Sequence, residues 1–206
     1  MIAAPPEILR CAQDFEERKG ELMKRIILAA ILGGLIVFVW SAVAHMVTPL
    51  GTMGLSVITN EAPVTDAIRA NVSKSGMYFF PGMDMSKEPT KEYEAKYKAG
   101  PTGLIIVSVG GAEMLSPKQL VFELLTNIAG AYIAAILAAM MIGTMMKRAF
   151  AITLLAVFAS VSLTFSYWIW YGFPAAFVLG EMVTELVGWF LAGLAIAKLV
   201  PPAAPS

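Results

Sequence analysis

Two carboxylates in an apolar stretch are the first residues of this chain that could do chemistry. Glu181 and Glu185 stand four residues apart, shortly after the aromatic segment SYWIWYGFP (residues 166–174). Residues at this spacing lie on one face of a helix, so both carboxyl groups are predicted to face the same neighbour. A charged group inside a bilayer costs about 3 kcal/mol on insertion scales unless it is paired, hydrated or protonated. The fold must therefore offset that cost.

Other polar residues are expected at the same depth. Charges balance within the polar segments of the chain, which leaves Glu123, Glu181 and Glu185 as acids without a matching base. Asn127 follows Glu123 by one helical turn, and the single histidine and Tyr167 fall at the ends of neighbouring predicted spans. The candidate polar cluster in the outer leaflet comprises His45, Glu123, Asn127, Tyr167, Glu181 and Glu185.

Three interpretations of this cluster remain open. Its members can be protonated or hydrogen-bonded to one another and hold the helices together near a wet interface. They can instead line an outward-facing polar cavity that handles protons, an ion or a small solute. The third is a metal site of His45 with Glu181 and Glu185, for which one histidine without an H-E-x-x-H signature is weak support. The sequence has no P-loop, nucleophile elbow, dinucleotide fingerprint or C-x-x-C pattern, so no cofactor is predicted.

Composition sets the class of the protein. Hydrophobic residues make up 58% of the 206 residues and charged residues 15%, whereas about a quarter of a soluble domain is charged. The chain is therefore predicted to be a polytopic membrane protein in contact with the lipid bilayer. A formal net charge of zero gives no electrostatic basis for a nucleic-acid partner. With the single cysteine Cys11, the chain cannot form an internal disulfide.

Four segments are long enough to cross a hydrocarbon core, which needs roughly 20 apolar residues in a helix. Three groups of basic residues flank them and, by the positive-inside rule, place both termini in the cytoplasm: Lys24 with Arg25, Lys147 with Arg148, and Lys198. The predicted fold class is an all-α membrane protein with four transmembrane helices and a small α+β extracytoplasmic cap between helices 1 and 2. The divisions are a cytoplasmic amphipathic N-terminal segment (1–25), transmembrane helices (26–47, 120–146, 150–171 and 176–200), the cap (48–119) and a cytoplasmic tail (201–206).

Capping and turn residues divide the cap. Helices are expected over residues 63–74 and 91–98, the second behind Thr90 as its N-cap. Residues 76–80 and 103–109 have the composition of strands, and a third candidate strand covers 55–58. Ser116, Pro117 and Gln119 predict a capping box where the second span begins. Because a two-stranded sheet is marginal in water, the cap is expected to lean on the membrane helices, the bilayer surface or a partner.

Two further patterns concern packing. Apolar residues recur at helical spacing near the N-terminus and predict an amphipathic helix that lies on the inner membrane surface, docks on a partner or is simply solvated: Ile8, Cys11, Phe15, Leu22 and Ile26. Small residues recur every four positions in two spans, which allows helix backbones to approach closely in lipid: Gly180, Thr184, Gly188 and Ala192, and also Gly130, Ala134 and Ala138.

Several longer stretches resemble a known group of proteins. They are GGLIVFVWSAVAHM (33–46), GMYFFPGM (76–83), AGPTGLIIV (99–107), SPKQLVFELLTNIAGA (116–131) and above all SYWIWYGFP (166–174). Together they resemble an uncharacterised family of bacterial four-helix integral membrane proteins. The resemblance covers about residues 24–198 and implies a bacterial cytoplasmic (inner) membrane location. It supplies no activity and no functional residues.

The expected function follows from small size, absent cofactor motifs and two peripheral elements suited to docking. We expect a non-enzymatic four-helix bundle that serves as an accessory or scaffolding subunit of a larger membrane complex, with membrane proteins as partners. One alternative is a small proton- or ion-linked transporter that uses the outer-leaflet carboxylates. The other is a membrane enzyme that acts on a lipid or quinone.

Overall fold

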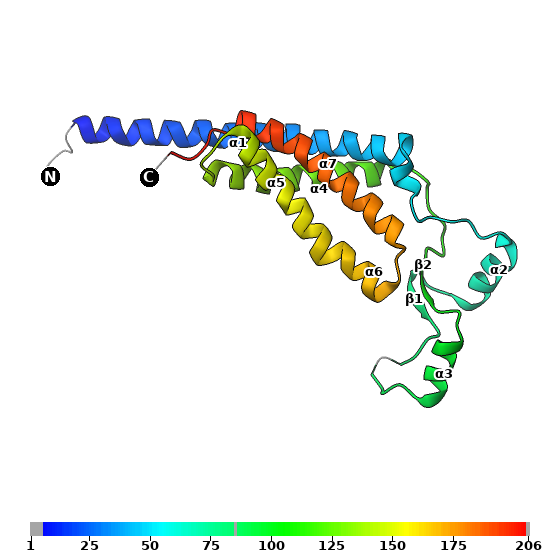
Figure 1. Ribbon diagram of the computed structural model, residues 1–206. Coiled ribbons are helices and arrows are strands. Elements are labelled where there is room, and N and C mark those ends of the chain that lie inside the picture. The colour runs from blue at the N-terminus through cyan, green and yellow to red at the C-terminus, as the bar shows by residue number, and fades with distance from the viewer. Residues whose placement is uncertain (1–5, 85, 205–206) are drawn as a thin grey trace.

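A computed structural model describes residues 6–84 and 86–204 of the chain. Long helices lie at one end and a smaller lobe, the cap, lies at the end opposite both termini (Figure 1). The elements in chain order are α1 (Pro6–Val47), η1 (Pro49–Thr52), α2 (Glu61–Asn71), β1 (Gly76–Phe80), α3 (Lys91–Ala99), β2 (Gly103–Val107), α4 (Pro117–Met140), α5 (Met145–Ala159), η2 (Ser160–Thr164), α6 (Phe165–Tyr171) and α7 (Ala175–Leu199).

Four helical stretches within these described residues are long and apolar enough to cross a membrane. They are Gln13–Val47, Pro117–Met140, Met145–Tyr171 and Ala175–Leu199. The third stretch combines α5, the π-helical turn η2 and α6. The prediction of four membrane-compatible helices is therefore confirmed, and their leucine, isoleucine and phenylalanine side chains remain largely exposed, as lipid-facing residues must.

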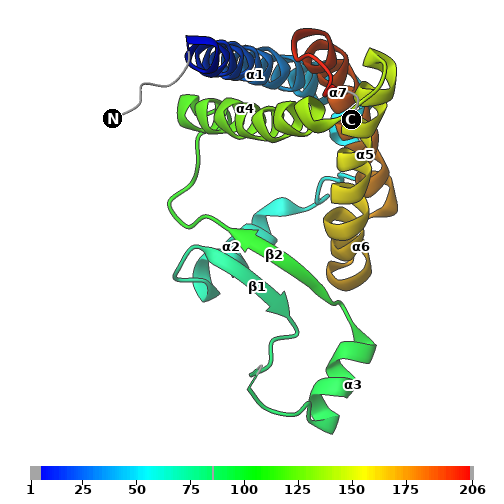
Figure 2. The same cartoon turned by 90° about the vertical axis from the view of Figure 1, so that its left-hand side faces the viewer.

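The helices pack more openly than the predicted bundle. α1 packs along both α4 and α7, whereas α5 packs along α7 and not along α1. α1 and α4 lie side by side, while α5 and α6 run away from them at a steep angle (Figure 2). As a result α7 is shared by two neighbours, and the third membrane-compatible stretch stands at the edge of the assembly.

Small residues permit the close helix contacts. The predicted face of α7 is confirmed as a buried one: Gly180, Thr184, Gly188 and Ala192. A Cβ added at Gly188 would lie 2.9 Å from Cδ1 of Trp40 in α1, and one added at Gly34 would lie 2.6 Å from the Cα of Ile128 in α4. Both contacts need a residue without a side chain. In lipid such close packing replaces water exclusion as the source of helix association.

Most local predictions for the cap are confirmed. Thr90 caps α3 because its Oγ1 accepts a hydrogen bond from the Tyr93 N–H at 3.1 Å. β1 and β2 pair antiparallel, with Gly76 opposite Val107 and Phe80 opposite Gly103. The third strand at 55–58 was a wrong prediction, since the sheet has two strands and this segment has no regular secondary structure.

The start of α4 and the N-terminal part of α1 also agree with predictions from the local sequence. α4 begins at Pro117, and the Ser116 N–H donates to Gln119 Oε1 at 3.2 Å, as the capping box predicts. The N-terminal helix does run into the first span, because α1 is continuous from Pro6. On its polar part the Lys19 ammonium lies 4.2 Å from the ring centre of Phe15, whereas the side chains of Ile8 and Cys11 lie outside the described part.

Candidate functional site

The predicted polar cluster is built around a contact between α1 and α7. His45 Nε2 lies 3.4 Å from Glu181 Oε1, an ion-pair distance, with the two side chains 41% and 31% exposed. On the other side of the ring, His45 Nδ1 lies 2.9 Å from the carbonyl oxygen of Ser41, one turn earlier in α1. The helix α1 therefore fixes the imidazole ring, and α7 brings a carboxylate to its free nitrogen.

The chemistry of this contact depends on where the hydrogens of the imidazole ring lie. Nδ1 of His45 faces two oxygen atoms of Ser41, the carbonyl oxygen at 2.9 Å and the hydroxyl oxygen at 3.5 Å. When Nε2 carries a hydrogen, it can donate to the Glu181 carboxylate, and when both ring nitrogens carry one, the contact is an ion pair. His45 and Glu181 therefore form a pair of titratable side chains, called the titratable pair below.

The other two carboxylates of the cluster are held within their own helices. Glu123 Oε1 accepts a hydrogen bond from Asn127 Nδ2 at 3.1 Å, and Glu185 Oε2 accepts one from Trp189 Nε1 at 2.8 Å. Glu185 also lies within electrostatic range of Glu181, Glu123 and His45. The structure therefore brings five of the six predicted residues into one region, where α1, α4 and α7 meet.

Tyr167 is the exception. Its ring packs against the rings of Tyr171 and Phe173, with centres 5.9 and 5.4 Å apart, beside the turn that joins α6 to α7. α6 does not pack along α1, so Tyr167 stands away from His45. The expectation that each span contributes one polar group to the cluster fails because the third stretch diverges from the first.

The metal interpretation finds no support in the geometry. Among the described residues, no group of three or more histidine, cysteine, aspartate or glutamate side chains is arranged to hold a metal ion. His45 and Glu181 approach each other, but Glu185 is turned toward Trp189. The polar cluster is therefore better described as the titratable pair of His45 and Glu181 with two further carboxylates nearby.

Arg148 is a residue whose role the sequence analysis missed. It was assigned only to the inner membrane boundary, yet its side chain is 3% exposed. Its Nη1 donates to the carbonyl oxygens of Ala138 at 3.2 Å and Val200 at 2.9 Å, and its Nη2 donates to the carbonyl oxygen of Ala197. One guanidinium from the first turn of α5 thereby caps the last turns of α4 and α7. The Ala138 carbonyl also accepts a hydrogen bond from the Met141 N–H at 3.4 Å.

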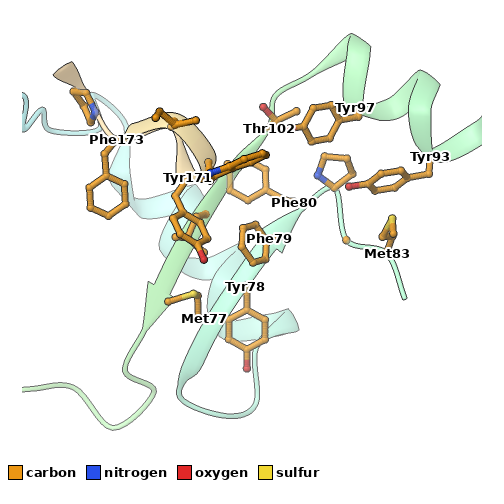
Figure 3. Close-up of a pocket in the computed structure, with 18 residues that line it drawn as sticks. Met77, Tyr78, Phe79, Phe80, Met83, Tyr93, Tyr97, Thr102, Tyr171 and Phe173 are labelled. Atoms are coloured by element: carbon orange, nitrogen blue, oxygen red, sulfur yellow. The ribbon is translucent and has the colours of Figure 1, made fainter. Parts of the chain in front are cut away.

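A large cavity is the second feature that the sequence analysis missed. It has a volume of about 770 Å³ and lies between the β1–β2 hairpin, α3 and the turn from α6 to α7. Aromatic side chains from all three regions converge on it (Figure 3). The stretches GMYFFPGM and SYWIWYGFP both line it. Their aromatic content was the available signal, but only the fold brings the two stretches together.

Comparisons of the chain with protein-family models, with curated proteins and with solved structures found no match.

Proposed function

We propose that this protein is a non-enzymatic integral membrane protein that serves as an accessory or scaffolding subunit of a larger membrane complex. The observation that carries the proposal is that the cap has no buried core of its own. Throughout its described residues no side chain is fully buried, in either helix or on either strand. A two-stranded sheet with two short helices and no core is only marginally stable in water. The cap therefore needs to pack against another surface.

The apolar residues of the linkers support a docking role. Val57, which precedes α2, is 94% exposed, and Met114, which precedes α4, is 96% exposed. Both lie in segments that join the cap to the long helices. Apolar side chains gain free energy when a protein or membrane contact removes them from water. A membrane protein partner that covers them would stabilise the cap at the same time.

The proposed setting is the bacterial inner membrane, with both termini cytoplasmic and the cap extracytoplasmic. Lys147 belongs to the first turn of α5 and Lys198 to the last turn of α7. These two helix ends lie away from the cap, on the side toward which the N-terminal part of α1 projects (Figure 1). Positive residues favour the cytoplasmic side. The resemblance described above implies the same membrane, and it makes membership of that bacterial family part of this proposal.

Purification from native membranes in mild detergent tests the subunit proposal. We expect the protein to migrate as a particle larger than one protomer, together with at least one other membrane protein. Val57→Asp combined with Met114→Asp should release that partner, because two carboxylates would be forced into an apolar contact. Ser56→Asp combined with Thr59→Asp is the matched control, since it adds the same two charges at exposed polar positions nearby. A lone monomer in native membranes would refute the proposal.

A second candidate function is proton-linked transport, and the His45–Glu181 contact favours it. The titratable pair is partly exposed, and two further carboxylates lie close by. In liposomes loaded with a pH-sensitive dye, the reconstituted protein should dissipate a pH gradient. Glu181→Gln combined with Glu185→Gln should abolish that flux, whereas Glu113→Gln in the cap should not. A flux that survives the double substitution would rule this function out.

A further inference from the structure

The cavity between the cap and the α6–α7 turn is walled by aromatic rings from distant parts of the chain. Phe79 of β1 stacks on Tyr171 at the end of α6, with ring centres 6.1 Å apart and planes inclined by 27°. Tyr93 and Tyr97 of α3 flank the opposite side, and Trp170 also lines the cavity (Figure 3). A volume of about 770 Å³ lies within the range of small-molecule sites.

The lining carries no charge at neutral pH. Methionine, phenylalanine, tyrosine, tryptophan, leucine, isoleucine, proline, glycine and threonine make up the whole wall. The composition of the cap does not explain this absence of charge, because the cap carries seven acidic and seven basic residues and none of them lines the cavity. A charged ligand would lose its hydration here without gaining an ion pair. The lining therefore fits an uncharged ligand.

The aromatic lining allows the cavity to distinguish a ligand that contains a planar ring from one that has only a hydrocarbon chain. A lipid chain already has an apolar environment in the bilayer, so it gains little from transfer into an apolar cavity. A planar ring gains offset stacking on aromatic side chains, which adds to the effect of the area that it buries. Trp170, Tyr93 and Phe80 contribute aromatic rings to the lining. The cavity should consequently prefer a ligand that contains a ring.

Hydroxyl groups at the wall supply hydrogen-bond donors. The Tyr78 hydroxyl is engaged, since it donates to the Lys74 carbonyl oxygen at 2.6 Å. Within the described residues, the hydroxyls of Tyr93, Tyr97 and Thr102 have no hydrogen-bond acceptor in the protein. Hydroxyls of this kind can donate to a carbonyl oxygen of a ligand. An uncharged ring with carbonyl acceptors satisfies both the stacking surfaces and these donors.

The position of the cavity indicates that its ligand enters from the membrane. Trp170 and Tyr171 end a stretch that is long and apolar enough to cross a membrane, so the cavity lies beside the region where such a helix leaves the hydrocarbon. An apolar tail could remain in lipid while the ring enters the cavity. We propose that this cavity binds an uncharged ring that carries carbonyl oxygens and an apolar tail, which is the chemistry of a membrane quinone. The inference goes beyond the subunit role, and it concerns binding alone.

Tryptophan fluorescence tests the proposal with a neighbouring control. The full chain in detergent micelles would be titrated with a benzoquinone that carries a ten-carbon tail, because a quinone quenches an indole that it contacts. Trp170 lines the cavity, whereas Trp168 packs edge-on against Phe165 and does not line it. We expect saturable quenching in the native protein and in Trp168→Phe, above a linear background. In Trp170→Phe only the linear background should remain.

Two further variants address the ligand chemistry and do not remove the reporter. Tyr97→Phe deletes one hydroxyl and should weaken the quinone about fivefold, the effect of one hydrogen bond. Gly103→Val should also weaken it, because a Cβ at Gly103 would meet Cζ of Phe80 at 2.7 Å and push that ring into the cavity. A saturated monoacylglycerol, which has a tail and no ring, should not displace the quinone.

Three results would overturn the proposal. One is quenching that stays linear in quinone concentration in the native protein. Another is saturable quenching that survives in Trp170→Phe and disappears in Trp168→Phe. The third is displacement of the quinone by the monoacylglycerol at equal concentration, which would show that the cavity selects only for an apolar chain. None of these results depends on whether the protein has a membrane partner.

Discussion

Replacing Arg148 by glutamine should loosen the end of the molecule that is opposite the cap. The carbonyl of Ala197 would normally accept a hydrogen bond from the residue four positions later, but that residue is Pro201, which has no N–H. Arg148 supplies the missing donor and also binds the carbonyls of Val200 and Ala138. The substitution therefore removes the donor of the Ala197 and Val200 carbonyls in a buried place, whereas the Ala138 carbonyl keeps its hydrogen bond from the Met141 N–H.

The size of the effect follows from these three hydrogen bonds. A hydrogen bond from a charged donor contributes roughly 1.5 kcal/mol at the lower end of its range, which gives about 4.5 kcal/mol for three. Removing the buried guanidinium also removes its own desolvation cost, of which its Nε without a partner is one part. Arg148→Gln should thus lower the free energy of unfolding by about 3 kcal/mol. Arg148→Lys should lose about half of that, because an ammonium lacks the planar fork.

Unfolding in mixed micelles, with increasing denaturing detergent, measures this difference. Lys147→Gln is the matched control: it removes the same charge one residue earlier, but Lys147 is exposed. If both basic residues served only to set the membrane orientation, the two variants would be equally stable. A difference of less than about 1 kcal/mol between them, which is the usual range of surface substitutions, would refute the capping role.

Two other predictions concern a helix contact and a loop. Gly34→Ala should destabilise the protein by about 2 kcal/mol in the same unfolding assay, because its Cβ would meet the Ile128 backbone. Gly20→Ala is the control, since nothing lies within 4 Å of its Cβ. It should instead stabilise α1 by up to about 1 kcal/mol. The Ser86 hydroxyl and N–H donate to the Asp84 carboxylate and hold the pKa of Asp84 below its ordinary value. The two hydrogen bonds therefore stabilise the folded protein at pH values above the pKa of the unfolded state, and this contribution is lost as the pH falls through the pKa of the folded state. A carboxyl titration by NMR should show the Asp84 pKa rising in Ser86→Ala, and an unchanged value would contradict the assignment.

Local signals made much of this fold predictable. Helix starts depend on a few neighbouring residues, so Thr90 and Pro117 were placed correctly from their caps alone. The buried face of α7 follows from a four-residue period that the sequence displays directly. The two strands could likewise be read from composition, because each is a short apolar run between turn residues.

Non-local features could not be predicted in the same way. The segment 55–58 has strand-like residues, but whether it pairs depends on an edge that the sequence does not reveal. The direction of α6 separates Tyr167 from the polar cluster, and no residue near Tyr167 indicates it. Arg148 has the same chemistry as a residue that only sets membrane orientation. Its role depends on three helix ends that meet in space and are far apart in the chain.

The open packing divides the molecule into two parts that experiments can treat separately. α7 meets α1 through Gly188, and on another side it meets α5, where a Cβ at Gly193 would lie 3.0 Å from the Ala149 carbonyl oxygen. The titratable pair of His45 and Glu181 belongs to the first contact. The aromatic cavity belongs to the third stretch and the cap. Because substitutions without shared partners act nearly independently, Glu181→Gln should leave quinone quenching at Trp170 unchanged. If it altered that quenching, the two regions would be coupled through α7.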